Sequence, residues 1–140
     1  MQGYNVIAVF SPDGRKMLMC ERVKEPYKGL YNMVGGKIEQ GEDGYTAAFR
    51  ELFEESGITE TDIGLVHLMD FSYPLDYCYV EVYAGRLLHD VVIQEEKNPL
   101  LWMSVDENYF DMKRFAGEGN IGHIMEHVKL HRDLIFDLEL

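Results

Sequence analysis

The sequence is poor in cysteine and has no long apolar run, and each shortage excludes a class of protein. Its 140 residues include two cysteines, Cys20 and Cys78, which form no close-spaced motif. A disulfide framework or a cysteine-rich metal site is therefore not expected, and both are interpreted as reduced, partly buried thiols. No apolar stretch approaches the ~20 residues of a membrane-spanning helix. The opening residues, MQGYNVIAVF, lack the basic and small-residue signals of a secretory leader, so we expect a cytoplasmic protein.

Basic residues are also scarce. There are 13 Lys and Arg against 25 Asp and Glu, which gives a formal net charge of −12. A surface this acidic argues against binding to nucleic acid, which needs a basic patch, and against binding to an anionic membrane. It remains compatible with a small phosphate ligand, because a bound cation can invert the local field. We therefore expect a small-molecule partner, and neither nucleic acid nor membrane.

The chain carries no internal repeat, low-complexity tract or linker, and its length fits a single domain over residues 1–140. Apolar segments predict strands at 4–10, 16–21, 31–34, 63–72, 76–84 and 100–105, with a weaker one at 91–93. A helix is expected at about 43–56, closed by Gly57 in the left-handed conformation. The tail from 106 onward is expected to be helical, broken at Gly117 and Gly119. Strands interleaved with two main helices indicate an α/β sandwich with a mixed sheet.

The segment GKIEQGEDGYTAAFRELFEESGI, residues 36–58, has a spacing that predicts a cation site. A helix advances roughly 100° per residue, so Glu51, Glu54 and Glu55 fall within one arc. Their mutual repulsion favours a hard divalent cation with oxygen ligands among them. Arg50 precedes Glu54 by one helical turn and can hold a glutamate as a bidentate partner.

The surroundings of the glutamates strengthen that interpretation over a merely solvated acidic face. Gly35 and Gly36 allow the backbone to approach a ligand closely, and Glu42 can add a carboxylate from the start of the helix. An apolar stripe should turn the other part of the helix toward the core. Its members are Tyr45, Ala48, Phe49, Leu52 and Phe53.

Residues 36–58 read Gly, five residues, Glu, seven residues, Arg-Glu-Leu-any-Glu-Glu-any-Gly-Ile, and this resembles the Nudix box of the MutT-like Nudix hydrolases. The resemblance implies an α/β/α sandwich with a mixed β-sheet, in which the box helix presents its glutamates. It also implies Mg²⁺, with Mn²⁺ as the alternative ion, bound by Glu54, Glu55 and the carbonyl of Gly35. Glu51 would bind a metal or position the attacking water, and Arg50 belongs with the catalytic residues.

MutT-like proteins take a last catalytic glutamate from a loop well after the box. Residues 94–104, QEEKNPLLWMS, resemble that loop. The offset from Trp102 favours Glu96 over Glu95 as a catalytic residue and metal ligand, and a charged loop residue is the alternative for either.

Positive charge is needed for the phosphates, and Arg22, Lys28 and Lys37 flank the box in sequence. Arg22 is favoured, because MutT-like proteins often carry an arginine at this point. Gly36 is expected to contact the substrate through its backbone. For each cation taken alone, an ordinary surface residue is favoured over a phosphate ligand.

The base would be read elsewhere. GLYNMVGGKIEQGE resembles proteins that clean oxidised purine nucleoside triphosphates, in some of which the residue at Asn32 reads the base. A bond from Asn32 to its own backbone is the alternative. Later in the chain, Phe110 and Phe115 offer stacking faces, with core packing favoured for both. Glu118 or Asn120 offers a polar contact to the base; these substrate-binding expectations include Phe115 and Asn120.

The leading expectation is Mg²⁺-dependent hydrolysis of a pyrophosphate bond in a nucleoside triphosphate, such as 8-oxo-dGTP, to a monophosphate and pyrophosphate. Hydrolysis of ADP-ribose or of a dinucleoside polyphosphate stays open, since Pro74 and Tyr77 narrowly miss the downstream markers of those branches. A non-catalytic nucleotide-sensing module is the third possibility. His123, His127 and His131 recur every four residues and suggest a metal-binding or pH-sensitive face, exposed histidines, or contacts in a homodimer.

Overall fold

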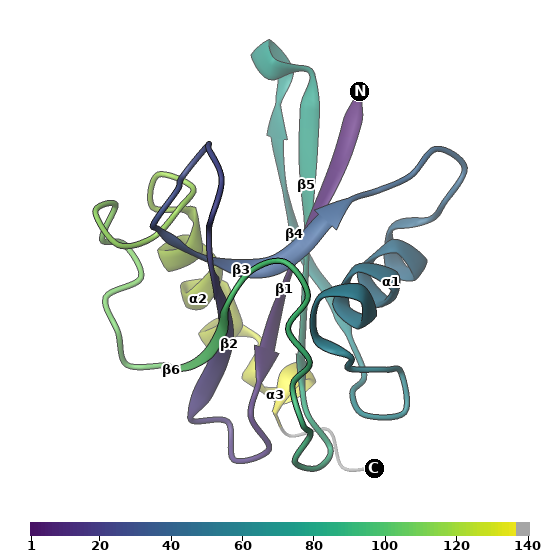
Figure 1. The fold of residues 1–140 in the computed structure, drawn as a ribbon, viewed down its shortest axis with the longest axis vertical. Helices are drawn as coiled ribbons and strands as arrows, with labels where there is room; N and C mark the ends of the chain where they lie inside the picture. The colour runs from purple at the N-terminus through teal and green to yellow at the C-terminus, as the bar shows by residue number, and fades with distance from the viewer. Residues whose placement is uncertain (137–140) are drawn as a thin grey trace.

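The computed structural model describes residues 1–136, in which one six-stranded sheet has the order β4-β5-β1-β3-β2-β6 (Figure 1). The strands are β1 (Gln2–Phe10), β2 (Lys16–Glu21), β3 (Tyr31–Lys37), β4 (Val66–Tyr73), β5 (Cys78–Arg86) and β6 (Leu100–Ser104). The helices are α1 (Gly44–Ser56), a 3₁₀ turn η1 (Pro74–Asp76), α2 (Asn120–Leu130) and α3 (Arg132–Ile135). No helix within residues 1–136 is long and apolar enough to cross a membrane.

The sheet is mixed, because β1 pairs with β5 in parallel while every other pairing is antiparallel. Side chains alternate along β1, so Ile7 and Val9 enter the core beneath α1, whereas Ala8 and Phe10 enter the core on the α2 side. Figure 1 shows α1 apart from α2 and α3. The predicted α/β sandwich with a mixed sheet is therefore confirmed.

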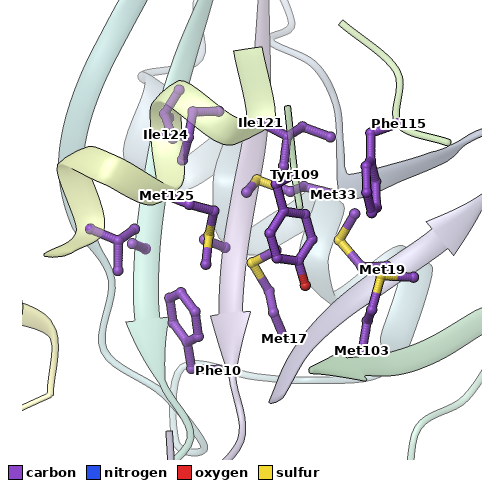
Figure 2. Packing of buried hydrophobic residues seen from close by; sticks show 14 of the residues in the cluster. Phe10, Met17, Met19, Met33, Met103, Tyr109, Phe115, Ile121, Ile124 and Met125 are labelled. Atoms are coloured by element: carbon purple, nitrogen blue, oxygen red, sulfur yellow. The ribbon is translucent and has the colours of Figure 1, made fainter. Parts of the chain in front are cut away.

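The core on the α2 side is rich in methionine and aromatic rings (Figure 2). Tyr109 and Phe115 pack with ring centroids 4.8 Å apart, and both side chains are buried. Full burial of an apolar side chain of this size contributes about 1.5–3 kcal/mol. This packing anchors residues 106–119 to the sheet.

Residues 106–119 are not helical, and the prediction of a helix there is wrong. The backbone of Tyr31 exchanges hydrogen bonds with Arg114 and Ala116, both at 2.9 Å, which holds residues 114–116 beside β3, while most of the segment forms turns. Gly117 and Gly119 have φ of 89° and 91°, and α2 begins only after them. The last residues of the expected helical tail, 137–140, lie outside the described part of the chain.

The segment 91–93 is also not a strand. Its loop is instead fastened to the end of α1, where the Gln94 amide donates to the Ser56 carbonyl at 2.9 Å. Val91 and Ile93 pack partly against the core beneath α1.

The buried face of α1 is turned away from the predicted stripe. Ala47, Ala48, Leu52 and Ser56 are buried, whereas Tyr45 and Phe53 are 49 % and 56 % exposed. The small side chains of Ala47 and Ala48 allow the helix to lie close to the sheet, and Tyr45 packs instead against the Phe49 ring at 5.1 Å. This rotation carries Glu51 and Glu55 to the edge of the buried face, above β3.

Candidate functional site

The ends of α1 are set by local signals in the sequence. Asp43 Oδ1 accepts a hydrogen bond from the Thr46 amide at 2.8 Å and caps the N-terminus. Gly57, with φ of 80°, donates to the Phe53 carbonyl and ends the helix, as predicted. These caps fix which turn of the helix carries the glutamates.

Arg50 links the glutamates of α1 to the loop that precedes it. Its Nε and Nη2 donate to the two carboxylate oxygens of Glu42 at 2.8 and 3.0 Å, and its Nη1 donates to Glu51 at 3.0 Å and to Glu54 at 3.3 Å. Nη2 also reaches the Lys37 carbonyl at 2.9 Å. The expected bidentate partner of Arg50 is thus Glu42, and the guanidinium holds the pKa of that carboxyl below its usual range.

The side chain of Glu55 extends from α1 to the glycine pair of β3. Its Oε2 accepts the Gly35 amide at 3.0 Å. Burial, followed by the charge of Glu51, raises the pKa of Glu55 to about 7, and the Gly35 bond opposes that rise. Burial also raises the pKa of Glu51, against the effect of Arg50. These carboxylates are destabilised by their surroundings, and a cation among them would relieve that.

Gly36 leaves the space that the carboxylate of Glu51 occupies. A Cβ atom at Gly36 would overlap the Glu51 carboxylate, so only glycine allows the side chain to lie there. The Gly36 amide donates to Asn5 Oδ1 at 3.1 Å. Gly36 therefore makes room for the Glu51 carboxylate, and Gly35 offers its backbone amide to Glu55.

A cavity of about 280 Å³ opens beside these residues, and we call it the Glu55 cavity. Its lining includes Glu55, Gly35, Gly36, Arg22, Asn5 and Asn98. Arg22 is the predicted phosphate cation that reaches it. Lys28 and Lys37 do not line it, because Lys28 lies on the exposed 22–30 loop and Lys37 contributes its carbonyl to Arg50 instead.

A second cavity of about 370 Å³ adjoins the first, sharing Tyr27, Asn32 and Met33 with it. We call it the Asn120 cavity, and its further polar lining comes from Asn120, Tyr73, Asp76, Glu118 and Cys78. The two cavities bring β3, the 22–30 loop and the start of α2 to one groove.

The polar groups of the Asn120 cavity bind one another in pairs. The Asn120 amide donates to the Tyr73 hydroxyl. The Tyr27 hydroxyl donates to Glu118 at 2.8 Å. Burial and the Glu118 carboxylate raise the pKa of Tyr27 to about 12, so this hydroxyl keeps its proton. Asn32 lines the cavity, and its Oδ1 accepts the Met33 amide at 2.8 Å, which is the backbone bond that the sequence left open.

Neither aromatic expected to stack on a base faces this groove. Phe115 is 1 % exposed and belongs to the core (Figure 2), so the expectation that it contacts substrate is wrong. Its backbone is drawn in beside Tyr31 and its ring packs on Tyr109. Phe110 is half exposed and covers Gly122, outside both cavities.

The two loop glutamates differ in what they do. Glu95 Oε2 accepts the Leu100 amide at 2.5 Å and so shapes the loop before β6. Glu96 is exposed and makes no hydrogen bond with another described residue. Burial is the main cause of the raised pKa of Glu55, and the charge of Glu96 is the smallest of the contributions.

Two other clusters lie away from this groove. His67, Asp70 and Glu81 have ligand atoms within 4.8 Å of one another on β4 and β5, but His67 already bonds Asp70 at 2.6 Å and Glu81 accepts from Tyr83 at 2.8 Å. On α2, the rings of His123 and His127 lie 4.7 Å apart and those of His127 and His131 6.4 Å apart. Neither cluster contributes to the two cavities.

Sequence reasoning missed several residues of the groove, namely Asn5, Tyr27, Tyr73, Cys78 and Asn98. Asn5 alone carried a signal, because it is a polar residue at an inward position of a strand whose other inward positions are apolar. The rest are brought together only by the fold.

An acidic helix with an arginine clamp lies over a glycine pair in strand β3, as the resemblance to Nudix hydrolases implies. The family model for the NUDIX domain matches residues 1–126, and the chain belongs to this family. It is an enzyme that hydrolyses pyrophosphate bonds, and Nudix hydrolases depend on divalent metals. The oxygen-only donor set of Glu51, Glu54, Glu55 and the Gly35 carbonyl fits a hard divalent cation.

The chain is also similar to a curated relative in sequence and to solved structures in fold. An oxidized purine nucleoside triphosphate hydrolase of Mus musculus is 24% identical over 106 residues, which are 74% of this chain and 67% of the relative. The fold is similar to a C. elegans Ap4A hydrolase in a binary complex, with a TM-score of 0.76, 15% identity and coverage of 96% of this chain and 100% of that one. It is also similar to MutT from a study of Aliivibrio salmonicida and Vibrio cholerae, with a TM-score of 0.70, 20% identity and coverage of 92% and 98%.

Proposed function

We propose that the chain hydrolyses a purine nucleoside triphosphate, including one oxidised at the base, to the monophosphate and pyrophosphate. The observation that carries the proposal is the adjoining pair of cavities. The Glu55 cavity offers the Glu55 carboxylate and Arg22 for a metal-bound triphosphate, and the Asn120 cavity offers amide, hydroxyl and carboxylate groups for a base. The similarity to the Mus musculus oxidized purine nucleoside triphosphate hydrolase supports the same substrate class.

The polar groups of the Asn120 cavity suit a purine edge that mixes donors and acceptors. Asn120 uses its amide nitrogen on Tyr73, which leaves its carbonyl oxygen as an acceptor. The Asn32 carbonyl oxygen is engaged with Met33, which leaves its amide nitrogen as a donor. Oxidation at C8 turns the purine N7 into a donor and adds an acceptor oxygen, so such a base presents partners for both.

For the phosphate end, we assign Glu54, Glu55 and the Gly35 carbonyl to a Mg²⁺ ion, with Mn²⁺ as the alternative and Glu96 as a further ligand. Mg²⁺ bound there would neutralise phosphate charge and stabilise charge that develops at phosphorus. Glu51, held by Arg50, binds the metal or accepts a proton from the attacking water. Arg22 pairs with a phosphate oxygen, and the Gly36 backbone borders the phosphates. Water adds across the P–O–P bond between the α and β phosphates, and the products are the nucleoside monophosphate and pyrophosphate.

A substrate panel tests the proposal. The chain with Mg²⁺ is given 8-oxo-dGTP, dGTP, ADP-ribose and Ap4A, and the products are resolved by chromatography. We expect 8-oxo-dGTP to yield its monophosphate and pyrophosphate, with kcat/KM about tenfold or more above that for dGTP, the value of one added hydrogen bond. Preferred cleavage of ADP-ribose or Ap4A would replace this substrate assignment with the corresponding one.

Two variants separate the ends of the groove. Glu54→Gln should lower kcat about a hundredfold or more, since a metal-bound carboxylate is hard to replace. Wild-type activity of that variant at saturating Mg²⁺ would make the metal assignment wrong. Asn120→Ala should raise KM for the triphosphate about tenfold and leave Mn²⁺ binding by the nucleotide-free protein unchanged.

A further inference from the structure

Asn5 is a buried polar residue with an unmet hydrogen bond. Its side chain is 2 % exposed, and on its face of β1 the next residues are the apolar Ile7 and Val9. Ser56, the other buried polar residue among those described, donates its hydroxyl to the Leu52 carbonyl at 2.6 Å. Asn5 Nδ2, by contrast, has no hydrogen-bond partner in residues 1–136.

The position of Asn5 places this amide at the phosphate end of the groove. Asn5 lies directly opposite Gly36 in the β1–β3 ladder, and its Oδ1 accepts the Gly36 amide at 3.1 Å. It lines the Glu55 cavity together with Gly35, Gly36 and Glu55. The side-chain oxygen therefore holds Gly36, and the side-chain nitrogen is buried in a residue that lines the cavity.

The neighbouring carboxylates are already engaged. Glu55 accepts from Gly35, and Glu51 accepts from Arg50. Glu81, the neighbour of Asn5 on β5, accepts from the Tyr83 hydroxyl. A buried amide without an acceptor destabilises a fold, and an apolar residue would avoid that loss. Since none of these carboxylates, nor any other described residue, accepts from Asn5 Nδ2, a bound ligand is the acceptor that we consider.

We propose that Asn5 is a substrate-positioning residue, whose Nδ2 donates to a ligand oxygen held between Gly35–Gly36 of β3 and Glu55. The inference rests on the proposed function. The oxygen belongs either to a phosphate or to a water in the hydration shell of the metal, and both are acceptors of the kind the amide lacks. Asn5 Oδ1 accepts the Gly36 amide at the same time, so one side chain positions both the glycine pair and the ligand.

The direct test is the side-chain amide signal of Asn5, observed by NMR in the full chain and assigned by its loss in Asn5→Asp. Spectra are recorded for the protein alone, with Mg²⁺, and with Mg²⁺ plus an α,β-methylene nucleoside triphosphate. We expect the signal to shift and its hydrogen exchange to slow when the acceptor arrives. A response to Mg²⁺ alone identifies a metal-bound water, and a response only to the analogue identifies a phosphate oxygen. An unchanged signal with all sites saturated overturns the proposal.

Calorimetry of the variants provides the second test. Asn5→Asp keeps an acceptor for Gly36 but loses the donor, so analogue binding should weaken about tenfold, the value of one hydrogen bond, while Mn²⁺ alone binds as tightly or more tightly. Asn108→Asp is the matched control, because exposed Asn108 Oδ1 likewise accepts a backbone amide, that of Phe110, at 3.2 Å. Equal analogue affinity in wild type and folded Asn5→Asp would contradict the proposal.

The same titrations keep the two proposals distinguishable. If the wild-type protein does not bind the analogue, the assignment to nucleoside triphosphates fails. The Asn5 signal is then followed with Mg²⁺ and ADP-ribose, and its response or lack of response still decides the role of Asn5.

Discussion

Arg50 binds Glu42 in a bidentate manner through the Nε–Nη2 edge of its guanidinium, with Nε to Oε2 at 2.8 Å and Nη2 to Oε1 at 3.0 Å. This pair spans from the loop before α1 to the middle of the helix, and its remaining nitrogen reaches Glu51 and Glu54. One planar cation thus sets the position of the loop and of the glutamates together. Lysine, a point charge, cannot reproduce that geometry.

Arg50→Lys should therefore lower both activity and stability. The paired side chains are 28% and 14% exposed, so part of the bond strength is lost to solvent screening. We expect a loss of about 1–2 kcal/mol in the free energy of unfolding and a fall in kcat of about tenfold or more, measured by denaturant titration and steady-state kinetics. Arg114→Lys, at the exposed pair with Glu107, is the control and should change neither. Unaltered kcat in Arg50→Lys would show that Arg50 does not position the glutamates.

Gly36→Ala should damage catalysis more than folding. The new Cβ would overlap the carboxylate of Glu51, which is the end of a flexible side chain and can move aside. We expect kcat to fall about tenfold or more, because Glu51 leaves its place, with the thermal midpoint changed little. Gly64→Ala is the matched control, since its Cβ would meet nothing within 4 Å. Equal kinetics in both variants would refute the idea that Gly36 makes room for Glu51.

Glu96→Gln and Glu95→Gln should separate catalysis from loop structure. Glu96 makes no hydrogen bond with a described residue, so its change should lower kcat about tenfold or more without altering stability. Glu95 holds the Leu100 amide, and its amide replacement keeps an acceptor oxygen. Kinetics and thermal unfolding of the two variants provide the comparison. A larger loss of kcat in Glu95→Gln would reverse the assignment of the loop glutamate.

The two cysteines should differ in reactivity. Burial, with the charge of Glu55, raises the pKa of Cys20 to about 11, and the thiol is 4 % exposed. At pH 8 only about one part in a thousand of such a thiol is the reactive thiolate. Cys78 is half-buried and lines the Asn120 cavity.

We therefore expect iodoacetamide at pH 8 to modify Cys78 well before Cys20, as followed by mass spectrometry of peptides. A nucleotide analogue with Mg²⁺ should slow the reaction at Cys78 by filling the cavity. Faster modification of Cys20, or no protection of Cys78 by a bound analogue, would contradict the described groove.

Much of the fold was predictable because its signals are local. Asp43 and Gly57 mark the ends of α1 through bonds to residues within one turn, and the continuous apolar run at the end of β1 marks a strand buried on both faces. The helix expected after residue 106 fails for a nonlocal reason. The backbone of Tyr31 forms hydrogen bonds with Arg114 and Ala116, and nothing in residues 106–119 alone predicts Tyr31 as their partner.

The candidate site divides in the same way. The crowding of Glu51, Glu54 and Glu55 beside a glycine pair follows from helical spacing, so the sequence by itself predicted a cation site, and the motif of residues 36–58 identified the family. Tertiary structure alone decided that Arg50 takes Glu42, that Phe115 is core, and that Asn5 lines the Glu55 cavity. Each of these depends on contacts between segments distant in the chain, where packing competes among many possible partners and residue type does not select one.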